Sequence, residues 1–363
     1  MREHRGKTAA GLVITVGLLW WVLRDVSAAE VIHELRAADP WLLGGAVLLA
    51  TFSFVLRAMR WRVLLLPAHA GSRFDSRFGA TCIGFTVNNL LPARLGEFAR
   101  AIALARSESI GIGASFASLV VERVFDGLIL AFFLLVTISL PDFPLGEGTT
   151  ASLVRRTANL GAIGFGVAFA LLWLAARKPD VAIGAFRGSI GRLLGARLRQ
   201  RALSVLESFI QGLGSLRQPA VFVKALAWSA VVWLNLSASV WLGLLAFDIR
   251  EPGFTGAMFL QSLIAFAVAA PSSPGFFGPF EFSARIGLGA WEIGSARIVS
   301  FATSYHILTF LPVTLIGLWY IRRFGLTWAE MGRSEELFES GDGTDLKREG
   351  GLSAAAIPES GDG

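Results

Sequence analysis

Residues 88–100 read NNLLPARLGEFAR and place charged side chains at helical spacing inside a chain that is otherwise strongly apolar. Arg94, Glu97 and Arg100 are three residues apart, so a helix that begins after Pro92 carries them along one side, where Glu97 can pair with either arginine. The planar fork of a guanidinium group can bind two phosphate oxygens together. The spacing therefore predicts that one arginine remains to meet an anion, such as a lipid phosphate entering beside the helix start.

The proline of this run interrupts the helical ladder, and the backbone groups it frees need partners in protein or water. Asn88 and Asn89 can supply those hydrogen bonds. The alternative is that the arginines lie at the cytoplasmic interface and only extend their charged ends into water. The two interpretations are evenly balanced for Arg100, whereas Arg94 and Glu97 lie nearer the break and favour a binding role.

A second polar run, PSSPGFFGPFEFSAR at 271–285, also combines helix-breaking residues with hydroxyl and charged groups. Ser272 and Ser273 can hydrogen-bond a headgroup, although capping of exposed backbone is the simpler role. Glu281 and Arg285 are four residues apart, in the favourable order for a helical pair. Glu281 could also take up a proton in an apolar cavity, because burial raises the pKa of a carboxyl group.

Two other charged runs border apolar segments. VERVFDG at 121–127 contains Glu122, Arg123 and Asp126 in one helical neighbourhood. Its simpler interpretation is a charged collar that holds a helix end at the interface, and binding chemistry is the alternative. RAMRWR at 57–62 is basic and aromatic, which predicts an interfacial anchor.

Tyr305 and His306 open a late apolar run, where His306 is a candidate proton relay or, more simply, a structural hydrogen-bonding residue. The four histidines are scattered and Cys82 is the single cysteine, so we expect no metal site, no disulfide and no cofactor. The sequence contains no GxxxxGK[ST], HExxH or GxSxG motif, so an ATP-driven pump is not expected and no catalytic motif favours an enzyme.

The elements that must position these residues are hydrophobic helices. Of the 363 residues, 54% are hydrophobic and only 17% are charged, with a mean hydropathy of +0.59. A soluble domain carries about 25% charged residues, so the composition predicts a membrane protein. Six apolar windows approach the length of a membrane-spanning helix. They are 9–23, 40–56, 124–140, 160–176, 221–247 and 301–321.

The distribution of Lys and Arg predicts the orientation. These residues accumulate at the N-terminus, at 57–77, at 177–217 and at 322–323, which we assign to the cytoplasmic side. The net charge of +6 lies in these short segments, where topology and anionic lipids explain it better than nucleic acid does. The first apolar run lacks a good cleavage context and is expected to stay as an anchor. The acid-rich or uncharged connections at 25–39, 141–150 and 247–253 are then the outer loops.

Under this assignment residues 78–122 and 255–296 must each enter the membrane, break and return. We therefore predict an all-α polytopic membrane bundle with about six full spans and two re-entrant broken-helix segments, the alternative being eight ordinary spans. Two inverted units of this kind, whose broken helices meet near the midplane, are the layout of secondary transporters. The first unit comprises helix 40–56, break 88–96 and helix 124–140, and the second comprises helix 221–247, break 271–281 and helix 301–321.

The remaining segments flank this predicted membrane domain, which covers residues 1–323. The basic, amphipathic stretch 177–218 is predicted to lie on the inner leaflet. Residues 324–363 are polar and rich in Gly, Ser and Glu, which predicts a disordered cytoplasmic tail.

Four motifs carry a family resemblance: NNLLPARLGEFARA, VERVFDGL, PSSPGFFGPFE and SYHILTFLPVTLIGL. With these motifs in this order, the chain from about residue 10 to residue 323 resembles the lysylphosphatidylglycerol synthase transmembrane family of flippase-like proteins. The resemblance implies a multi-span inner-membrane protein associated with translocation of lipids or lipid-linked molecules. In the synthase this region is joined to an aminoacyl-transferase domain. Only about forty polar residues follow Arg323 here, so the synthase activity and its tRNA partner are not expected.

Two classes of function remain. In the first, the chain translocates a lipid or lipid-linked headgroup: Arg94 and Arg100 engage an anionic headgroup, and Glu97 and Glu281 balance charge or couple protons. In the second, the chain is a membrane enzyme, or the membrane partner of a separate lipid-modifying glycosyltransferase. An enzyme needs a positioned acid–base pair, which Glu97 with Glu122 or His306 could provide.

Overall fold

The computed structural model describes most of the predicted membrane domain. The described residues are 16–24, 26–91, 94–108, 110–144, 218–269 and 274–334, with 177–188 and scattered positions between 156 and 210. Their regular secondary structure is helical, which confirms the predicted all-α class.

Eight helices form two units of four. The first unit contains α3 (Pro40–Leu65), α4 (Phe74–Leu90), α5 (Gly96–Ser107) and α6 (Ile112–Ile138). The second contains α11 (Pro219–Ala246), α12 (Gly253–Ala269), α13 (Pro279–Leu288) and α14 (Ser295–Arg323). Short helices accompany them: α2 (Ala28–Ala37), α8 (Pro179–Gly188), α15 (Trp328–Gly332), η2 (Pro274–Phe276) and η3 (Gly289–Trp291).

Each contact between helices of one unit has a counterpart in the other. α3 packs on α4 as α11 packs on α12, and α5 packs on α6 as α13 packs on α14. Across the units, α4 packs against α14 as α12 packs against α6, and the two leading helices α3 and α11 pack on each other. The two units therefore show reciprocal helix contacts.

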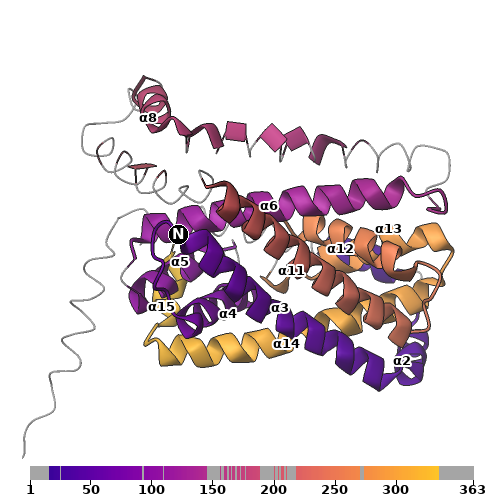
Figure 1. Cartoon of the computed structure of the whole chain (residues 1–363). Helices are drawn as coiled ribbons and strands as arrows, with labels where there is room; N and C mark the ends of the chain where they lie inside the picture. Colours follow the sequence, from indigo (N-terminus) through magenta and orange to yellow (C-terminus); the bar gives the residue numbers. More distant parts are fainter. Residues whose placement is uncertain are drawn as a thin grey trace, which may run out of the picture.

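The two leading helices run in opposite directions (Figure 1). Near the start of α3, the Asp39 amide donates to the carbonyl oxygen of Ala246 at the end of α11, at 2.8 Å. Near the end of α3, Arg60 Nη1 donates to Ser229 Oγ in the first half of α11, at 3.0 Å. An antiparallel pairing of equivalent helices is what an inverted repeat requires.

Three helices, α3, α11 and α14, combine spanning length with apolar composition among the described residues. α6 is as long, but Glu122, Arg123 and Asp126 lie along its first half and its centre. Helix α14 carries exposed apolar residues at successive turns, a stripe suited to contact with lipid. They are Ile307, Leu311, Leu315 and Trp319.

The remaining four helices form two hairpins, α4 with α5 and α12 with α13. α4 and α12 have 17 residues each, α5 has 12 and α13 has 10. At 1.5 Å per residue these helices are about 15–26 Å long, less than the roughly 30 Å of a hydrocarbon core. The hairpin helices are therefore shorter than the long helices of the bundle, which measure about 40 Å.

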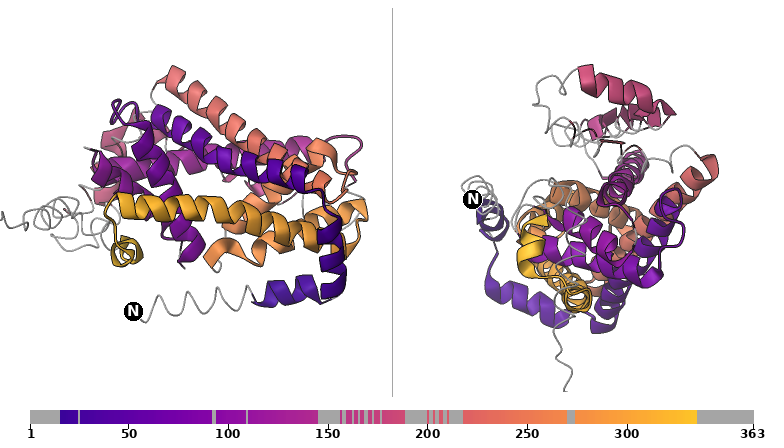
Figure 2. Two further views of the ribbon diagram at one scale, coloured as in Figure 1. Left: turned by 90° about the horizontal axis from the view of Figure 1, so that it is seen from below. Right: turned by 90° about the vertical axis from the view of Figure 1, so that its left-hand side faces the viewer.

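The ends of α6 and α11 lie at the same end of the bundle as the starts of α3 and α14. Phe143, just after α6, packs on Trp291, which precedes α14, with ring centroids 5.2 Å apart. Ser300 in α14 donates to the carbonyl oxygen of Val31 in α2, the helix that leads into α3. Figure 2 (left) shows α2 crossing the shared end of α3 and α14.

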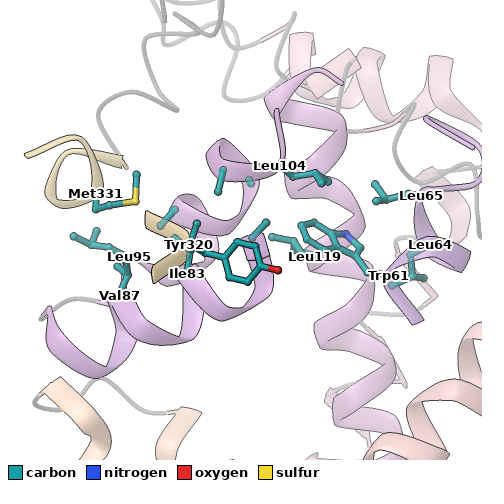
Figure 3. Packing of buried hydrophobic residues seen from close by; sticks show 14 of the residues in the cluster. Trp61, Leu64, Leu65, Ile83, Val87, Leu95, Leu104, Leu119, Tyr320 and Met331 are labelled. Atoms are coloured by element: carbon teal, nitrogen blue, oxygen red, sulfur yellow. The ribbon is translucent and has the colours of Figure 1, made fainter. Parts of the chain in front are cut away.

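The largest apolar cluster lies at the opposite end of the bundle, where α3, α4, α5, α6 and α14 converge; Figure 3 shows its members. This cluster corrects the predicted start of the polar tail. Residues 328–332 form α15, whose Met331 is fully buried in the cluster. Glu330 accepts from Arg106 at 2.8 Å, so a salt bridge also fixes the helix to α5. Residues 335–363 lie outside the described chain.

Several predicted features also fall outside the described residues. They are residues 9–15 of the first apolar window, scattered positions of the 160–176 window, most of the predicted inner-leaflet segment 177–218, and the candidate residues Pro92, Ser272 and Ser273.

Candidate substrate cavity

A cavity of about 560 Å³ lies where the tips of the two hairpins approach the long helices. It is lined at mid-height by Asp126 of α6, Trp233 of α11 and Thr309 of α14. Each of these residues stands at, or within one residue of, the middle of its helix. Transporter sites lie at this depth, near the midplane and at the interface between repeats.

Arg94 stands at the tip of the first hairpin, between α4 and α5. Its backbone is left-handed, with φ 55°, which turns the chain sharply between the two helices. Its guanidinium group donates to the carbonyl oxygen of Ala269, at the end of α12, and lies 5.7 Å from the ring centre of Phe276. The first break therefore touches the second, and both line the cavity.

Of the two asparagines, Asn88 contacts a backbone group beside the break, whereas Asn89 contacts a side chain of α14. Asn88 Oδ1 accepts from the Gly96 amide at 2.8 Å, at the start of α5. Asn88 Nδ2 also donates to Glu97 Oε2, at a longer 3.4 Å. Asn89 Nδ2 donates to Thr314 Oγ1 in α14 at 2.9 Å, which links the hairpin to the second unit.

Arg100 is buried and pairs outside its own helix. Its Nη1 and Nη2 donate to the two carboxylate oxygens of Glu122, at 2.7 and 3.1 Å, and its guanidinium carbon lies 4.0 Å from the ring centre of Trp61. The predicted pair between Arg100 and Glu97 is therefore not formed. The snorkelling alternative for Arg100 is also wrong, because the residue is only 4% exposed.

Asp126 is the second carboxylate of this buried network. Arg60 donates to both of its oxygens, and Trp233 Nε1 donates to Oδ1 at 2.8 Å. Arg60 Nη2 also lies 3.0 Å from Glu122, and Arg123 bridges Glu122 and Asp126 at 2.6 and 3.3 Å. Glu122 and Asp126 thus stand at the centre of a network of arginines rather than in a collar at a helix end.

The RAMRWR stretch is not an interfacial anchor, since Arg57, Arg60 and Trp61 are 4%, 0% and 0% exposed. Arg57 and Arg60 belong to this buried charged network, and the sequence interpretation missed them. Their spacing of three inside an apolar helix was the available signal, because it places two charges on one helix face. Trp233 carries no comparable signal, and its contact with Asp126 arises only from packing of α11 against α6.

The second break is built from left-handed residues, Gly275, Phe276 and Gly278. Beyond it, Glu281 Oε2 caps the start of α13 by accepting from the Gly278 amide at 2.7 Å. Its other oxygen lies 2.8 Å from His306 Nδ1 in α14. The imidazole lines the cavity and stacks on Phe280, with ring centroids 4.2 Å apart.

The remaining candidates contribute to packing around this break. Arg285 donates to the carbonyl oxygens of Trp21 and Val22, so it fixes this part of the first apolar window to α13. Tyr305 lies 2.8 Å from Ser239 Oγ, which itself donates to Ala46. The tyrosine hydroxyl must therefore be the donor, and it links α14 to α11. In the described part of the chain, no group of three His, Cys, Asp or Glu side chains could hold a metal ion.

Both units thus carry a polar pair between the second hairpin helix and the long helix that follows. In the first unit the pair is Arg100 with Glu122, and in the second it is Glu281 with His306. The arrangement can surround an anionic group at mid-depth, between arginines of one unit and a carboxylate–imidazole pair of the other.

The sequence of the chain is similar to those of known membrane proteins. The model of the family described as lysylphosphatidylglycerol synthase TM region matches residues 8–317. Glycosyltransferase AglD of Haloferax volcanii is 30% identical over 338 residues, which cover 86% of this chain and 54% of that protein. A UPF0104 membrane protein of Methanocaldococcus jannaschii is 28% identical over 134 residues, which cover 36% of this chain and 40% of that protein. The chain spans about half the length of the curated relatives it matches.

Proposed function

Because the chain belongs to the lysylphosphatidylglycerol synthase TM region family and is a multi-pass membrane protein, we propose that it translocates an anionic lipid or lipid-linked headgroup across the membrane. The observation that carries the proposal is the meeting of the two hairpin tips at a charged cavity, through the hydrogen bond from Arg94 to Ala269. Ionisable groups at membrane depth mark substrate pathways because burying them without a function is costly.

In this proposal each hairpin is re-entrant. α4 and α5 enter from the side where α3 ends, and α12 and α13 enter from the side where α11 ends. Their lengths and their antiparallel packing against the long helices support this arrangement. The N-terminus and the C-terminal segment then lie on the cytoplasmic side of the cell membrane, as the distribution of Lys and Arg predicts.

The cavity supports a lipid as the substrate because it has two kinds of wall. The lining includes arginines of α3, α5 and α6 together with apolar residues, among them Phe85, Ile264, Phe266 and Phe310. A lipid presents the matching pair of surfaces, a phosphate group and hydrocarbon chains. Movement of that phosphate from one leaflet to the other would require the Arg94 contact with Ala269 to open.

A second candidate function follows from the similarity to glycosyltransferase AglD. The chain matches about half of that protein, so it could act as the membrane partner of a separate enzyme that modifies lipids. The geometry favours this partner role over catalysis by the chain itself. Glu122 contacts three arginines and cannot readily act as a base. The pair that most resembles an acid–base pair is Glu281 with His306.

Lipid analysis of cells with and without the gene separates these functions. For a translocator, we expect the same lipid species with an altered distribution between leaflets, measured by modification of headgroups with an impermeant reagent. A missing or new lipid species, with leaflet distribution unchanged, would overturn translocation in favour of chemistry on the lipid. Reconstitution of the purified chain in proteoliposomes then tests translocation without other proteins.

A further inference from the structure

Arg57 of α3 lines the cavity with a guanidinium group that the protein satisfies only in part. The residue is 4% exposed, and its Nε and Nη1 atoms have no hydrogen-bond partner in the described chain. Its nearest carboxylate oxygen, Asp126 Oδ2, lies 4.0 Å from Nη1 and already accepts from Arg60. A buried donor without an acceptor is destabilising, so this group is arranged for an acceptor from outside the protein.

Two aromatic rings hold Arg57 in place. Its guanidinium carbon lies 5.1 Å from the ring centre of Phe85 in α4 and 5.3 Å from that of Trp233 in α11. The rings stabilise the charge without occupying its N–H groups. The side chain is therefore fixed at the cavity wall, near the middle of α11, and neither ring takes up its N–H groups.

The charges around the cavity do not cancel. Among the described residues, the wall carries four guanidinium groups and two carboxylates. Behind the wall the Arg60–Glu122 pair adds one charge of each sign. Beyond the wall, the Glu281 carboxylate lies 2.8 Å from His306 Nδ1. The wall groups themselves leave a surplus of two positive charges. The six wall groups are Arg57, Arg94, Arg100, Arg123, Glu97 and Asp126.

We propose that the group bound here is a lipid phosphate carrying two negative charges, a phosphate monoester or a diphosphate, and that Arg57 is its principal anchor. The inference rests on the translocation function proposed above and specifies the substrate class of the same cavity. A doubly charged phosphate balances the surplus, and its several unesterified oxygens can accept from Arg57 and from a neighbouring arginine together. A zwitterionic headgroup would leave the surplus uncompensated.

Proteoliposomes that contain the full chain test the proposal with three fluorescent lipids: phosphatidate, phosphatidylglycerol and phosphatidylcholine. The assay is run at about pH 8, since the second pKa of a phosphate monoester is about 6. We expect phosphatidate to move fastest and phosphatidylcholine to stay at the protein-free rate. Arg57→Gln should reduce the phosphatidate rate at least about tenfold, the loss expected for a charge-assisted hydrogen bond. Arg57→Lys should fall in between, because it keeps the charge but loses the fork.

Arg62→Gln is the matched control, because Arg62 lies on the same helix but is exposed, and it should leave the rate unchanged. Phosphatidylcholine or phosphatidylglycerol moving as fast as phosphatidate would overturn the charge inference while leaving translocation intact. The lipid preference is measured on the unmodified protein, so it holds as a test even where Arg57→Gln fails to fold.

If none of the three lipids moves, the chain does not translocate these lipids. Measurements of lipid binding in detergent then test whether the cavity is an anion site. Tighter binding of short-chain phosphatidate than of short-chain phosphatidylcholine, lost in Arg57→Gln, would support the anion site alone. Equal binding of the two lipids would overturn it. A third outcome is that inorganic pyrophosphate binds, loses binding in Arg57→Gln, and phosphatidate does not bind. This outcome would assign the site to a soluble phosphate and overturn the lipid inference.

Discussion

Arg94, at the tip of the first hairpin, donates a hydrogen bond to the carbonyl oxygen of Ala269 at the tip of the second. The two residues are 175 positions apart in the sequence, and their contact joins the two breaks at the cavity. Because the donor is a charged side chain and the acceptor is the last residue of α12, the contact can form and break without disturbing either helix. This relationship makes Arg94 the first residue to test.

Arg94→Gln should reduce headgroup translocation in proteoliposomes about tenfold, because it removes a charge-assisted hydrogen bond at the cavity. Expression and thermal stability should stay close to those of the unmodified protein, since Arg94 is half-buried at a break rather than inside a helix. Arg36→Gln, an exposed change on α2, is the control. Unchanged transport in Arg94→Gln would remove this arginine from the mechanism.

Single cysteines should show that the loops after α6 and α11 lie on one side of the membrane. In a Cys82→Ser background, Asp142→Cys and Arg250→Cys should both react with an impermeant maleimide added to intact cells, because both positions are exposed at the same end of the bundle. Arg322→Cys, exposed at the far end of α14, should react only after permeabilisation. Labelling of the two loops from opposite sides would exclude the re-entrant arrangement.

Glu122→Gln should be strongly destabilising, by about 3–5 kcal/mol, because it leaves buried arginines without their carboxylate. Glu122 contacts Arg60, Arg100 and Arg123 at 3.0, 2.7 and 2.6 Å. The measurement is the thermal unfolding midpoint in detergent, with the exposed Glu292→Gln as control. Adding Arg100→Met should recover part of the loss, since it removes one uncompensated charge. A midpoint unchanged in the single variant would show that the network is not a stabilising core.

Gly96→Ala should destabilise the first hairpin, because α4 and α5 meet there backbone to backbone. A Cβ atom on Gly96 would lie 2.1 Å from the Gly84 carbonyl oxygen and 2.5 Å from Asn88 Cγ. Forcing the helices apart costs about 1–3 kcal/mol. Gly289→Ala is the matched control, since no atom lies within 4 Å of its added Cβ. Equal unfolding midpoints for the two variants would contradict this close packing.

Glu108 should make stability depend on pH. Burial alone would raise the pKa of Glu108, but hydrogen bonds from Ser76, from the Arg73 amide and from the His69 and Arg73 side chains lower it to about 2. A carboxyl group whose pKa is lowered on folding stabilises the protein above its unfolded pKa of about 4.3 and loses this contribution as the pH falls toward the folded value.

Glu108→Gln should therefore lower the unfolding midpoint at neutral pH, and the difference from the unmodified protein should shrink as the pH falls from about 4.3 toward 2. The measurement is a series of thermal unfolding curves in detergent across this range. A difference that stays constant at every pH would show that the carboxylate charge does not contribute.

Some pairings could be foreseen because they depend on local sequence. Asn88, which precedes Pro92 by four positions, accepts from the Gly96 amide across the break. Glu281 caps its own helix by accepting from Gly278, three residues earlier. By contrast, helical spacing predicted that Glu97 pairs with Arg94 or Arg100. Arg100 instead pairs with Glu122, 22 residues away. Burial decides that choice, because Glu122 is fully buried whereas Glu97 is not.

The sequence by itself determined the class of protein, the family and the positions of the two breaks, because composition, motif order and helix-breaking residues are properties of short segments. Only the tertiary structure decided which charges meet. Arg57 and Arg60 contact Asp126 and Glu122 because α3 packs against α6 and α11, and His306 meets Glu281 because α14 packs against α13. An ion pair between helices depends on their depth and rotation, which long-range apolar packing sets and local spacing does not encode.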